Sequence, residues 1–536
     1  MISLSSVDQS RSPPAIHVPR EYNAAHDLLE RNLLAGRGSK LAYIDDNGSY
    51  SYQELASRVN RFANAILRLG VRMEQRVLLC LNDSIDFPVS FLGCIKAGVV
   101  PVAVNTLLTE SDLEYILNDS RAVVGVVSDP LLPRLQSMRG RLPHLCHVIA
   151  SGSADHGHFS LRDLMEEAPG AHETAPTTCD DTCFWLYSSG STGAPKGTVH
   201  AHGSLIQTAE LYARPIAGYR EEDLIFSVSK LSFAYGLGNS LIFPLAVGAT
   251  AILMSERPTP RAIMDRLRRY RPTVFCAVPT AFASLLAQPD LPGSDEMHLR
   301  ICTSAGEALP EDVGKRWYQR FGVHILDGIG STEMLHIYLS NRPDCVCYGT
   351  TGSPVPGYDV RIVDDDGRVV PPGETGELHV RGPSRALFYW NNRARTSSTF
   401  LGEWMRTGDK YRQREDGCYV YEGRCDDVFK VSGLYVSPVE VESVLVEHDA
   451  VLEAAVVAKA DAEGLVKPCA YLVLKPGRSA SLRELQEHVK SRLAPHKYPR
   501  WVEFVQDLPR TATGKIQRFK LREMAVESRS GEKIDR

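Results

Sequence analysis

The chain has 536 residues, a length at which one hydrophobic core usually stops growing, so at least two domains are expected. Hydrophobic residues make up 43%, charged residues 23%, and the formal net charge is −5, which argues against nucleic-acid binding through bulk charge and against long disorder. The close pair Cys345 and Cys347 has no partner pair at zinc-like spacing, so reduced thiols are expected. The absence of a signal peptide, a lipidation signal and an apolar run of the ~18 residues of a membrane helix predicts a cytoplasmic protein.

Up to about residue 345, the chain alternates short apolar runs with amphipathic segments. Buried strands are predicted at 76–81, 122–128, 183–188, 223–229, 250–254 and 273–279, and helices at 87–98 and 260–272. Strands that alternate with helices form parallel sheets covered by those helices. This part of the chain is therefore predicted to have an α/β fold.

Near residue 350 the pattern changes to pairs of strands around Asp-Gly turns, at 358–382 and 404–424, which predicts an antiparallel, barrel-like subdomain over about 350–425. A small α/β unit follows, with helices at 438–448 and 481–493 and strands at 451–460 and 468–475. We predict a large N-terminal domain, 1–425, made of two parallel-type βα subdomains and the barrel-like subdomain. A small mobile domain, 426–536, follows it, with a polar, frayed tail from about 524.

The segment YSSGSTGAPKGTVH, residues 187–200, is dense in glycine and hydroxyl groups and contains one cation, Lys196. It follows a predicted strand and precedes a helical pattern at 204–213. Glycine lets backbone N–H groups approach a ligand, hydroxyls donate hydrogen bonds and lysine adds a point charge, so the loop suits a polyphosphate. It lacks the Gly-Lys-Ser/Thr ending of the common phosphate loop and is not a GxGxxG dinucleotide loop. A plain surface turn is the alternative.

This segment resembles the phosphate loop of the adenylate-forming superfamily, which comprises acyl-CoA synthetases, adenylation domains and luciferases. Further motifs similar to those of the superfamily follow in order: AGEALP (305–310), GIGSTE (328–333), RTGD (406–409), GRCDDVFKVSG (423–433) and LPRTATGKIQR (508–518). The resemblance covers nearly the whole chain and implies a two-step reaction. A carboxylate attacks the α-phosphate of ATP to give an acyl-adenylate and pyrophosphate, and a thiol then displaces AMP. Such a site needs cations and precise placement more than a protein nucleophile.

The resemblance implies roles for the residues at matching positions. The phosphate loop would bind the β,γ-phosphates of ATP through Ser188, Ser189, Gly190, Ser191, Thr192, Gly193 and Lys196. Thr332 would donate to the α-phosphate, Glu333 would hold Mg²⁺, Asp409 and Arg424 would bind the ribose, and Gly306 and Glu307 would border the adenine. Local alternatives remain for two of these: Thr332 as a helix cap with Glu333 in the first turn, and Asp409 as a turn residue.

The resemblance also implies that Lys515 swings in to bridge the carboxylate and the α-phosphate during adenylation; a solvated lysine is the alternative. Asp426 matches the hinge about which the C-terminal domain rotates between the half-reactions. The rotation would bring Lys430, Ser432 and Gly433 to the thiol acceptor, coenzyme A. A plain turn glycine is the alternative for Gly433.

Segments 230–240, 304–310 and 327–343 resemble the benzoate-CoA ligase and hydroxybenzoate-CoA ligase subfamily, in which Ile329-Gly330 replaces an aromatic-Gly pair. The acyl pocket implied by that resemblance consists of Ala234, Tyr235, Gly236, Gly328, His336 and Ile337, a flat slot suited to an aromatic ring. His336 would contact the carboxylate or a ring substituent, or else is a core histidine. Ser232 stands where a bulky aromatic is expected, which leaves hydroxylated, aminated and larger bicyclic acids open.

The sequence thus predicts an aromatic carboxylic acid:CoA ligase that uses ATP, Mg²⁺ and CoA. The nearest alternative is a stand-alone adenylation enzyme that loads a carrier protein. An ADP-forming phosphotransferase or ATPase, and a non-catalytic binding protein with the same fold, are further alternatives. The predicted partners are small molecules, with no nucleic acid and no membrane, and both a monomer and a homodimer are compatible with the sequence.

Overall fold

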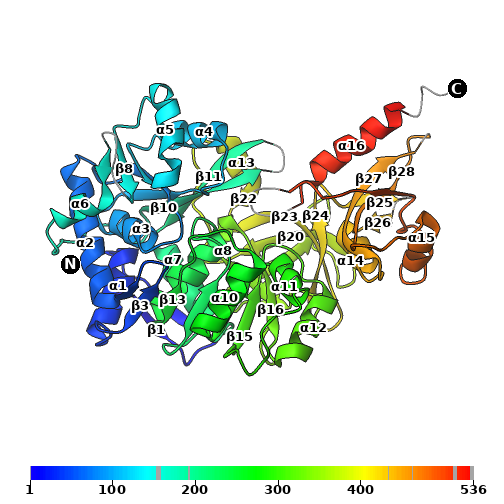
Figure 1. Ribbon diagram of the computed structural model, residues 1–536, viewed down its shortest axis with the longest axis horizontal. Coiled ribbons are helices and arrows are strands. Elements are labelled where there is room, and N and C mark those ends of the chain that lie inside the picture. Colours follow the sequence, from blue (N-terminus) through cyan, green and yellow to red (C-terminus); the bar gives the residue numbers. More distant parts are fainter. Residues whose placement is uncertain are drawn as a thin grey trace.

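The computed structural model describes residues 2–152, 158–190, 193–431, 434–461, 463–510 and 516–531 (Figure 1). It consists of a large body followed by a smaller unit at the C-terminal end (Figure 1). The chain begins with an antiparallel pair, β1 (Ser6–Asp8) and β2 (Ala15–His17), and helix α1 (Ala24–Leu34).

The first sheet of the large body runs in the order β21-β11-β10-β6-β5-β7-β8-β9. Neighbours from β10 to β9 are parallel, whereas β11 pairs antiparallel with both β10 and β21. Its strands are β5 (Arg76–Cys80), β6 (Val100–Ala103), β7 (Val124–Ser128), β8 (His147–Ser151), β9 (Phe159–Ser160), β10 (Thr182–Gly190), β11 (Gly193–Ala201) and β21 (Phe388–Tyr389). The helices of this region are α2 (Tyr52–Arg68), α3 (Asp86–Lys96), α4 (Glu110–Ser120), α5 (Leu132–Met138) and α6 (Leu161–Glu166).

The second sheet runs in the order β18-β17-β16-β15-β14-β12-β13-β3-β4 and is parallel from β16 to β3. Its strands are β3 (Leu41–Ile44), β4 (Ser49–Ser51), β12 (Leu224–Ser227), β13 (Thr250–Ile252), β14 (Val274–Ala277), β15 (Ile301–Ser304), β16 (Ile325–Gly330), β17 (Ile337–Ser340) and β18 (Ser353–Pro354). Its helices are α7 (Gly203–Thr208), α8 (Ala234–Leu237), α9 (Phe243–Val247), α10 (Pro260–Tyr270), α11 (Pro279–Leu286) and α12 (Glu311–Phe321), with π-helical turns η3 (Ala209–Ala213) and η4 (Gly238–Ile242). The predicted α/β fold of parallel sheets is confirmed.

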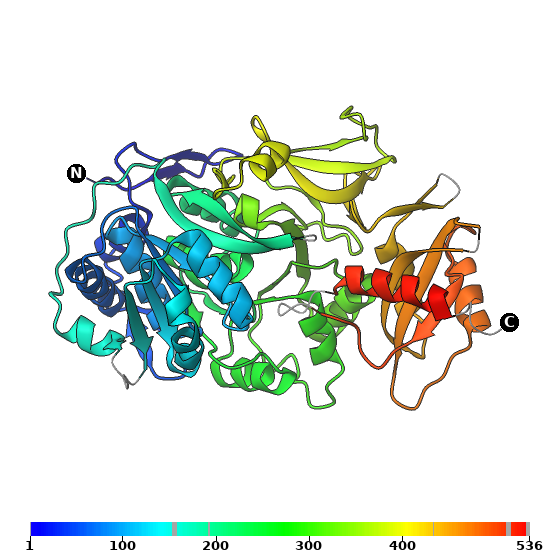
Figure 2. The same cartoon turned by 90° about the horizontal axis from the view of Figure 1, so that it is seen from above.

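The third sheet is antiparallel, as the Asp-Gly turns predicted. It contains β19 (Asp359–Val363), β20 (Thr375–Arg381), β22 (Phe400–Leu401), β23 (Trp404–Gln413) and β24 (Tyr419–Arg424), with helix α13 (Arg393–Thr399) nearby. In the view from above, its strands lie along one side of the large body (yellow in Figure 2).

The smaller unit contains the hairpin β25 (Phe429–Val431) and β26 (Leu434–Val436), the sheet β27 (Val451–Ala460), β28 (Val466–Leu474) and β29 (Trp501–Phe504), and the helices α14 (Pro438–Val446), α15 (Leu482–Lys490) and α16 (Arg518–Gly531). The predicted frayed tail from 524 is wrong as far as Gly531, because α16 continues to that residue and packs Leu521 and Ala525 against β27 and β28. The division of the chain at 425/426 remains a prediction.

Local sequence signals explain where several helices begin. Ser51 caps α2 in a capping box with Glu54: the Ser51 hydroxyl accepts from the Glu54 N–H, and the Glu54 carboxylate accepts from the Ser51 N–H. Thr259 caps α10, whose first residue is Pro260, a position where the missing N–H costs nothing.

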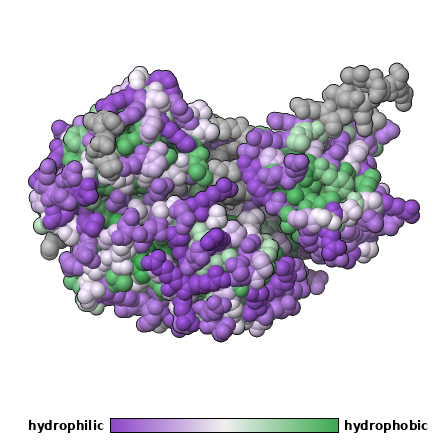
Figure 3. Space-filling view, in the orientation of Figure 1, coloured by the Kyte–Doolittle hydropathy of each residue, from purple (hydrophilic) through white to green (hydrophobic). Residues whose placement is uncertain are grey.

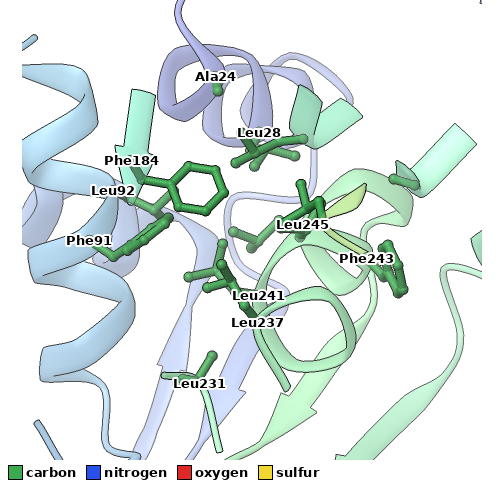
Figure 4. Packing of buried hydrophobic residues seen from close by; sticks show 14 of the residues in the cluster. Ala24, Leu28, Phe91, Leu92, Phe184, Leu231, Leu237, Leu241, Phe243 and Leu245 are labelled. Atoms are coloured by element: carbon green, nitrogen blue, oxygen red, sulfur yellow. The ribbon is translucent and has the colours of Figure 1, made fainter. Parts of the chain in front are cut away.

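The main core lies where the two parallel sheets meet. Phe184 of β10 is fully buried and packs edge-on against Phe91 of α3, with ring centroids 5.4 Å apart. Figure 4 shows both rings among side chains of α1 and of the α8–α9 segment, including Leu28 and Leu241. Burying each such side chain contributes about 1.5–3 kcal/mol, so this cluster fixes β10, and with it the phosphate segment, against the second sheet.

The described surface is mostly hydrophilic on the face shown in Figure 3, with hydrophobic side chains gathered on the smaller unit. Exposed hydrophobic residues of that unit include Leu465, Phe504 and Met524. Among the described residues, no helix combines the length and the apolar character needed to cross a membrane.

Candidate active site

The phosphate segment is a β-hairpin, not a loop between a strand and a helix. Strand β10 continues to Gly190 and β11 begins at Gly193, so Lys196 lies on a strand, directly opposite Ser188. The prediction missed β11 because Pro195 is disfavoured in strands. It is tolerated here because β21 pairs with β11 only at Thr198 and Val199.

The hairpin places the predicted phosphate residues as follows. The Ser188 hydroxyl is buried and has no hydrogen-bond partner within the described residues. Ser189, Gly190 and Gly193 lie at the facing ends of the two strands. Ser191 and Thr192 lie outside the described residues.

Three side chains from separate segments meet beside this hairpin. Lys196 Nζ lies 3.2 Å from Glu333 Oε1 and donates a hydrogen bond to the Tyr389 hydroxyl at 2.9 Å. The Tyr389 hydroxyl donates in turn to the same Glu333 oxygen at 2.7 Å, and Lys196 Nζ lies 4.2 Å from the centroid of the Tyr389 ring. We call Lys196, Glu333 and Tyr389 the charged triad.

The charged triad keeps Glu333 ionised. Burial alone would raise the pKa of this carboxyl, but the charge of Lys196 and the hydrogen bond from Tyr389 outweigh burial, and the pKa lies below its ordinary value. Burial and the Glu333 charge both raise the pKa of Tyr389, which stays a phenol. The site therefore holds an anionic oxygen beside a cation, a setting suited to phosphate and a divalent ion.

The backbone that carries Glu333 is held from both sides. Ser331 caps the 3₁₀ turn Thr332–Met334, so the alternative in which Thr332 is the cap is wrong. His200 Nε2 donates to the Thr332 carbonyl at 2.8 Å, and the Ala386 N–H donates to the Glu333 carbonyl at 2.7 Å. Burial lowers the pKa of His200 to about 4, so the ring is neutral at pH 7.

The predicted ribose residues form a pair across β23 and β24. Asp409 and Arg424 stand opposite each other, and Arg424 Nη1 donates to Asp409 Oδ1 at 2.8 Å. The alternative in which Asp409 closes a turn is wrong, because the residue lies inside β23. Gly408 has φ +72°, and a Cβ there would lie 2.8 Å from the Arg424 guanidinium, so this position needs glycine.

The predicted adenine side lies at the ends of β15 and β16. Gly306 follows β15 with φ +98°, and Glu307 follows it. Asp327, directly before Gly328, was not predicted. Burial raises the pKa of Asp327 to about 8. Its position immediately before the GIGSTE motif was the signal that sequence reasoning did not use.

The predicted acyl residues gather around His336. The His336 ring lies 5.4 Å from the Tyr235 ring, 5.4 Å from Tyr212 and 4.5 Å from Phe243, measured between ring centroids. His336 Nε2 faces the Tyr235 carbonyl at 3.3 Å, and burial lowers the His336 pKa to about 3. A Cβ at Gly238 would lie 2.3 Å from His336 Cδ2, so glycine makes room for this ring.

The other predicted pocket residues lie around this cluster. Ala234 and Gly236 share α8 with Tyr235, while Gly328 of β16 pairs with Ser340 of β17, the strand that begins at Ile337. Ser232 is buried just before α8. The Tyr235 hydroxyl and Thr303 Oγ1 are 2.7 Å apart, which ties the pocket to β15.

The remaining predictions lie on the smaller unit. The Asp426 carbonyl accepts from Arg522 of α16, and Lys430 packs over the Tyr435 ring, 4.5 Å from its centroid. Lys515, Ser432 and Gly433 lie outside the described residues.

Sequence reasoning missed Tyr389, which is 193 positions from Lys196 along the chain. The aromatic run 388–390 was its local signal: the Trp390 N–H donates to the Gly197 carbonyl at 2.8 Å, and the Trp390 ring packs on Trp185. These contacts hold β21 against the hairpin. No spacing rule connects the two segments, so only the fold reveals the triad.

Comparisons with known proteins agree with this geometry. The family model "AMP-binding enzyme" matches residues 29–390, and "AMP-binding enzyme C-terminal domain" matches residues 440–515. The chain is 62% identical to benzoate–CoA ligase of Thauera aromatica, with 97% of this chain and all of the relative covered. It is 49% identical to 4-hydroxybenzoate–CoA/benzoate–CoA ligase of Rhodopseudomonas palustris, with 95% of each covered.

Solved structures are similar over nearly the same length. A benzoate CoA ligase from Burkholderia xenovorans LB400 is 54% identical with a TM-score of 0.88, covering 94% of this chain and 100% of that one. The anthranilate CoA ligase AuaEII in complex with anthranoyl-AMP is 42% identical with a TM-score of 0.92, covering 96% and 99%. The family resemblance inferred from the motifs is confirmed, and the chain belongs to the AMP-binding enzyme family.

Proposed function

We propose that the chain is an AMP-forming aromatic carboxylic acid:CoA ligase acting on a benzoate-type acid. The observation that carries the proposal is the 62% identity to a benzoate–CoA ligase over 97% of the chain. It agrees with the sequence prediction of an aromatic acid:CoA ligase and disfavours the ADP-forming alternative. The two half-reactions are formation of an aryl-adenylate with release of pyrophosphate, and displacement of AMP by the thiol of CoA.

The charged triad supplies the electrostatics of the first half-reaction. Lys196 stabilises the phosphate oxygens of ATP, and Tyr389 holds Lys196 and Glu333 in register. Glu333 suits Mg²⁺, because this ion is usually held by one or two carboxylates together with substrate phosphates and Glu333 is ionised. When bound, Mg²⁺ neutralises the charge that develops on the phosphates.

The other nucleotide contacts follow the motif assignments. Thr332 donates to the α-phosphate, the phosphate hairpin cradles the β,γ-phosphates, and Gly306 and Glu307 border the adenine. Asp409 accepts from the ribose hydroxyls, with Arg424 fixing the orientation of its carboxylate. The short backbone path from Thr332 to His336 supports an acyl slot next to the α-phosphate.

His336 recognises the aromatic ring side of the acid in this proposal. The neutral ring donates through Nε2 to the Tyr235 carbonyl, so Nδ1 carries a lone pair and acts only as an acceptor. Nδ1 is buried and has no hydrogen-bond partner within the described part of the chain. A hydroxyl or amino substituent can donate to such an atom, whereas a carboxylate oxygen cannot.

In this proposal Lys515 acts in adenylation, the first half-reaction, whereas the CoA-side residues of the smaller unit act in thioester formation, the second. We expect Lys515→Ala to lower adenylation by about 10²–10³-fold, because one cation is lost at the transition state. Thioester formation from supplied benzoyl-adenylate should persist. Equal loss in both assays would contradict the assignment. Asp426 as hinge, and Lys430, Ser432 and Gly433 as the CoA side, complete the proposal.

The direct test is a product assay with ATP, Mg²⁺ and CoA and a panel of benzoate, 2-aminobenzoate, hydroxybenzoates, naphthoates and hexanoate. We expect AMP and aryl-CoA in equal amounts, fastest with a benzoate-type acid. Acid-dependent pyrophosphate release without thioester would favour a carrier protein as acceptor, and ADP would refute the proposal.

We further propose a cytoplasmic location, as a monomer or homodimer, because ATP and CoA are both available there. Fractionation of the native host with an antibody against the chain, followed by sedimentation of the purified protein, tests both points.

A further inference from the structure

Two cysteines and an aspartate lie together at the end of the third sheet. Cys347 lies in the loop between β17 and β18, while Asp416 and Cys418 lie in the turn that joins β23 to β24. One donor atom from each of the three lies within 4.8 Å of the others. Cys345, next to Cys347 in the CxC pair, is exposed and outside this cluster. The fold thus pairs Cys347 with a cysteine far along the chain.

Backbone hydrogen bonds hold the two segments together. The Thr351 N–H donates to the Tyr419 carbonyl at 2.9 Å, and the Tyr419 N–H donates to the Gly352 carbonyl at 2.9 Å. The Asn341 side chain accepts from the Cys347 N–H at 2.8 Å. The backbone therefore holds the two segments side by side, which keeps the two cysteine side chains within reach of each other.

The two sulfurs have different surroundings. Arg414 Nη1 donates to Cys347 Sγ at 3.5 Å, and its guanidinium also pairs with Asp416 at 2.8 Å. A cation beside sulfur is the setting in which a thiolate reacts with oxidants. Burial, together with the neighbouring Cys347 and Asp416, raises the pKa of Cys418 to about 11, so Cys418 stays a thiol. Both side chains are only half-buried, so a small oxidant can reach them.

A divalent metal is the competing occupant of the same donors. The guanidinium of Arg414 already contacts both Cys347 and Asp416, so a metal ion would have to displace it from two of the three donors. The cluster is therefore arranged for redox chemistry of the sulfurs. We propose that Cys347 and Cys418 form a reversible disulfide when the protein meets a hydroperoxide.

The chemistry balances in two steps. The Cys347 thiolate attacks the hydroperoxide, breaks the O–O bond and becomes a sulfenic acid, while the leaving oxygen takes a proton and departs as water or an alcohol. The Cys418 thiol then attacks the sulfenic sulfur, forms the S–S bond and releases water. Two thiols lose two electrons to the peroxide, and an added dithiol reverses the oxidation by exchange.

The disulfide would tie the β17–β18 loop to the hairpin β23–β24, which carries Asp409 and Arg424. Closing the 2.05 Å bond requires the sulfurs to approach by side-chain rotation from their present separation. Oxidation would thereby restrict the hairpin on which the proposed ribose site depends.

The test is to expose the full-length protein to hydrogen peroxide, alkylate free thiols and map the peptides without reduction. We expect one linked peptide pair, Cys347 with Cys418, which a dithiol separates. In Cys418→Ser, the sulfenic acid should persist at Cys347 and react with dimedone, whereas Cys347→Ser should leave Cys418 unlabelled. Cys345→Ser and Cys146→Ser are matched controls and should not change the linkage.

Two results would overturn the proposal. One is oxidation of exposed Cys146 without a Cys347–Cys418 link, or a link through Cys345 instead. The other is zinc that copurifies with the wild-type protein, protects both thiols from alkylation and is lost in Asp416→Asn. The wild-type mapping needs no substitution, so a variant that fails to fold does not decide the outcome.

Discussion

Glu333 and His336 are three residues apart and both are largely buried, yet burial leaves one charged and the other neutral. Glu333 gains a cation and a phenol hydroxyl within hydrogen-bond distance, and its pKa falls below the ordinary value. His336 gains aromatic neighbours and one carbonyl, and its pKa falls to about 3. The charge of each side chain is therefore decided by its hydrogen-bond and ionic partners and not by its depth of burial. One short segment thereby joins an ionic side, which we propose binds phosphate, to an uncharged side, which we propose binds the acid.

The largest expected effect comes from removing the charge on the phosphate side. Glu333→Gln should lower the rate of adenylation by about 10²–10³-fold, because the anionic oxygen that suits Mg²⁺ is lost. Acid-dependent pyrophosphate release at saturating ATP measures this rate. Glu311→Gln on the exposed face of α12 is the matched control. An unchanged rate in Glu333→Gln would mean that the charged triad does not act in adenylation.

Tyr389→Phe tests how much the Tyr389 hydroxyl contributes to the charged triad. The ring that lies under Lys196 remains, but the hydroxyl that links Lys196 to Glu333 is lost. Hydrogen bonds to charged groups contribute about 1.5–3 kcal/mol, so kcat/KM should fall by about 10- to 100-fold. Tyr318→Phe, on the exposed side of α12, is the control. If Tyr389→Phe has a lower free energy of unfolding but an unchanged kcat/KM, Tyr389 only supports the fold.

The sequence was sufficient for the parallel sheets, the antiparallel region and the family, because each rests on local periodicity or on motifs of residues close together in the chain. Strand β11 was missed because its pairing with β10 outweighs the turn preference of Gly193 and Pro195. Tyr389 was missed because its partners lie in distant segments. The charge states of Glu333 and His336 also depend on three-dimensional neighbours, which no pattern of residues within a motif reveals.

The neutral state of His336 should affect how the free energy of unfolding changes with pH. His336, His200 and His202 are buried, and burial holds the pKa values at about 3, 4 and 4. Unfolding lets each take up a proton below its ordinary pKa of ~6.5, so their contribution to stability is complete above that pH and falls as pH drops toward 4. The depressed pKa of Glu333 matters only below its ordinary value of ~4.5.

The measurement is the free energy of unfolding in urea between pH 7 and pH 5. Each buried histidine should add a slope that rises across this window and approaches about 1.4 kcal/mol per pH unit near pH 5, where His336→Gln should reduce the slope by about one proton. His298→Gln, an exposed position, is the control. A slope that His336→Gln leaves unchanged would mean that His336 is charged in the folded protein, and the contrast with Glu333 would fail.

The smallest expected effect comes from removing the hydrogen bond between Tyr235 and Thr303 beside His336. Tyr235→Phe removes a hydroxyl that lies 2.7 Å from Thr303 Oγ1 but keeps the ring that stacks on His336. A neutral hydrogen bond contributes about 0.5–1.5 kcal/mol, so the free energy of unfolding should fall by that amount, with KM for benzoate almost unchanged. Thr303→Val should cost a similar amount, and the double variant little more than either, because both remove the same bond. A large rise in KM with unchanged stability would mean instead that the hydroxyl contacts the acid. The proposed acyl side would then include a polar contact from Tyr235 in addition to His336 Nδ1, and the Tyr235 hydroxyl would act in recognition of the substrate and not only in the packing of the pocket.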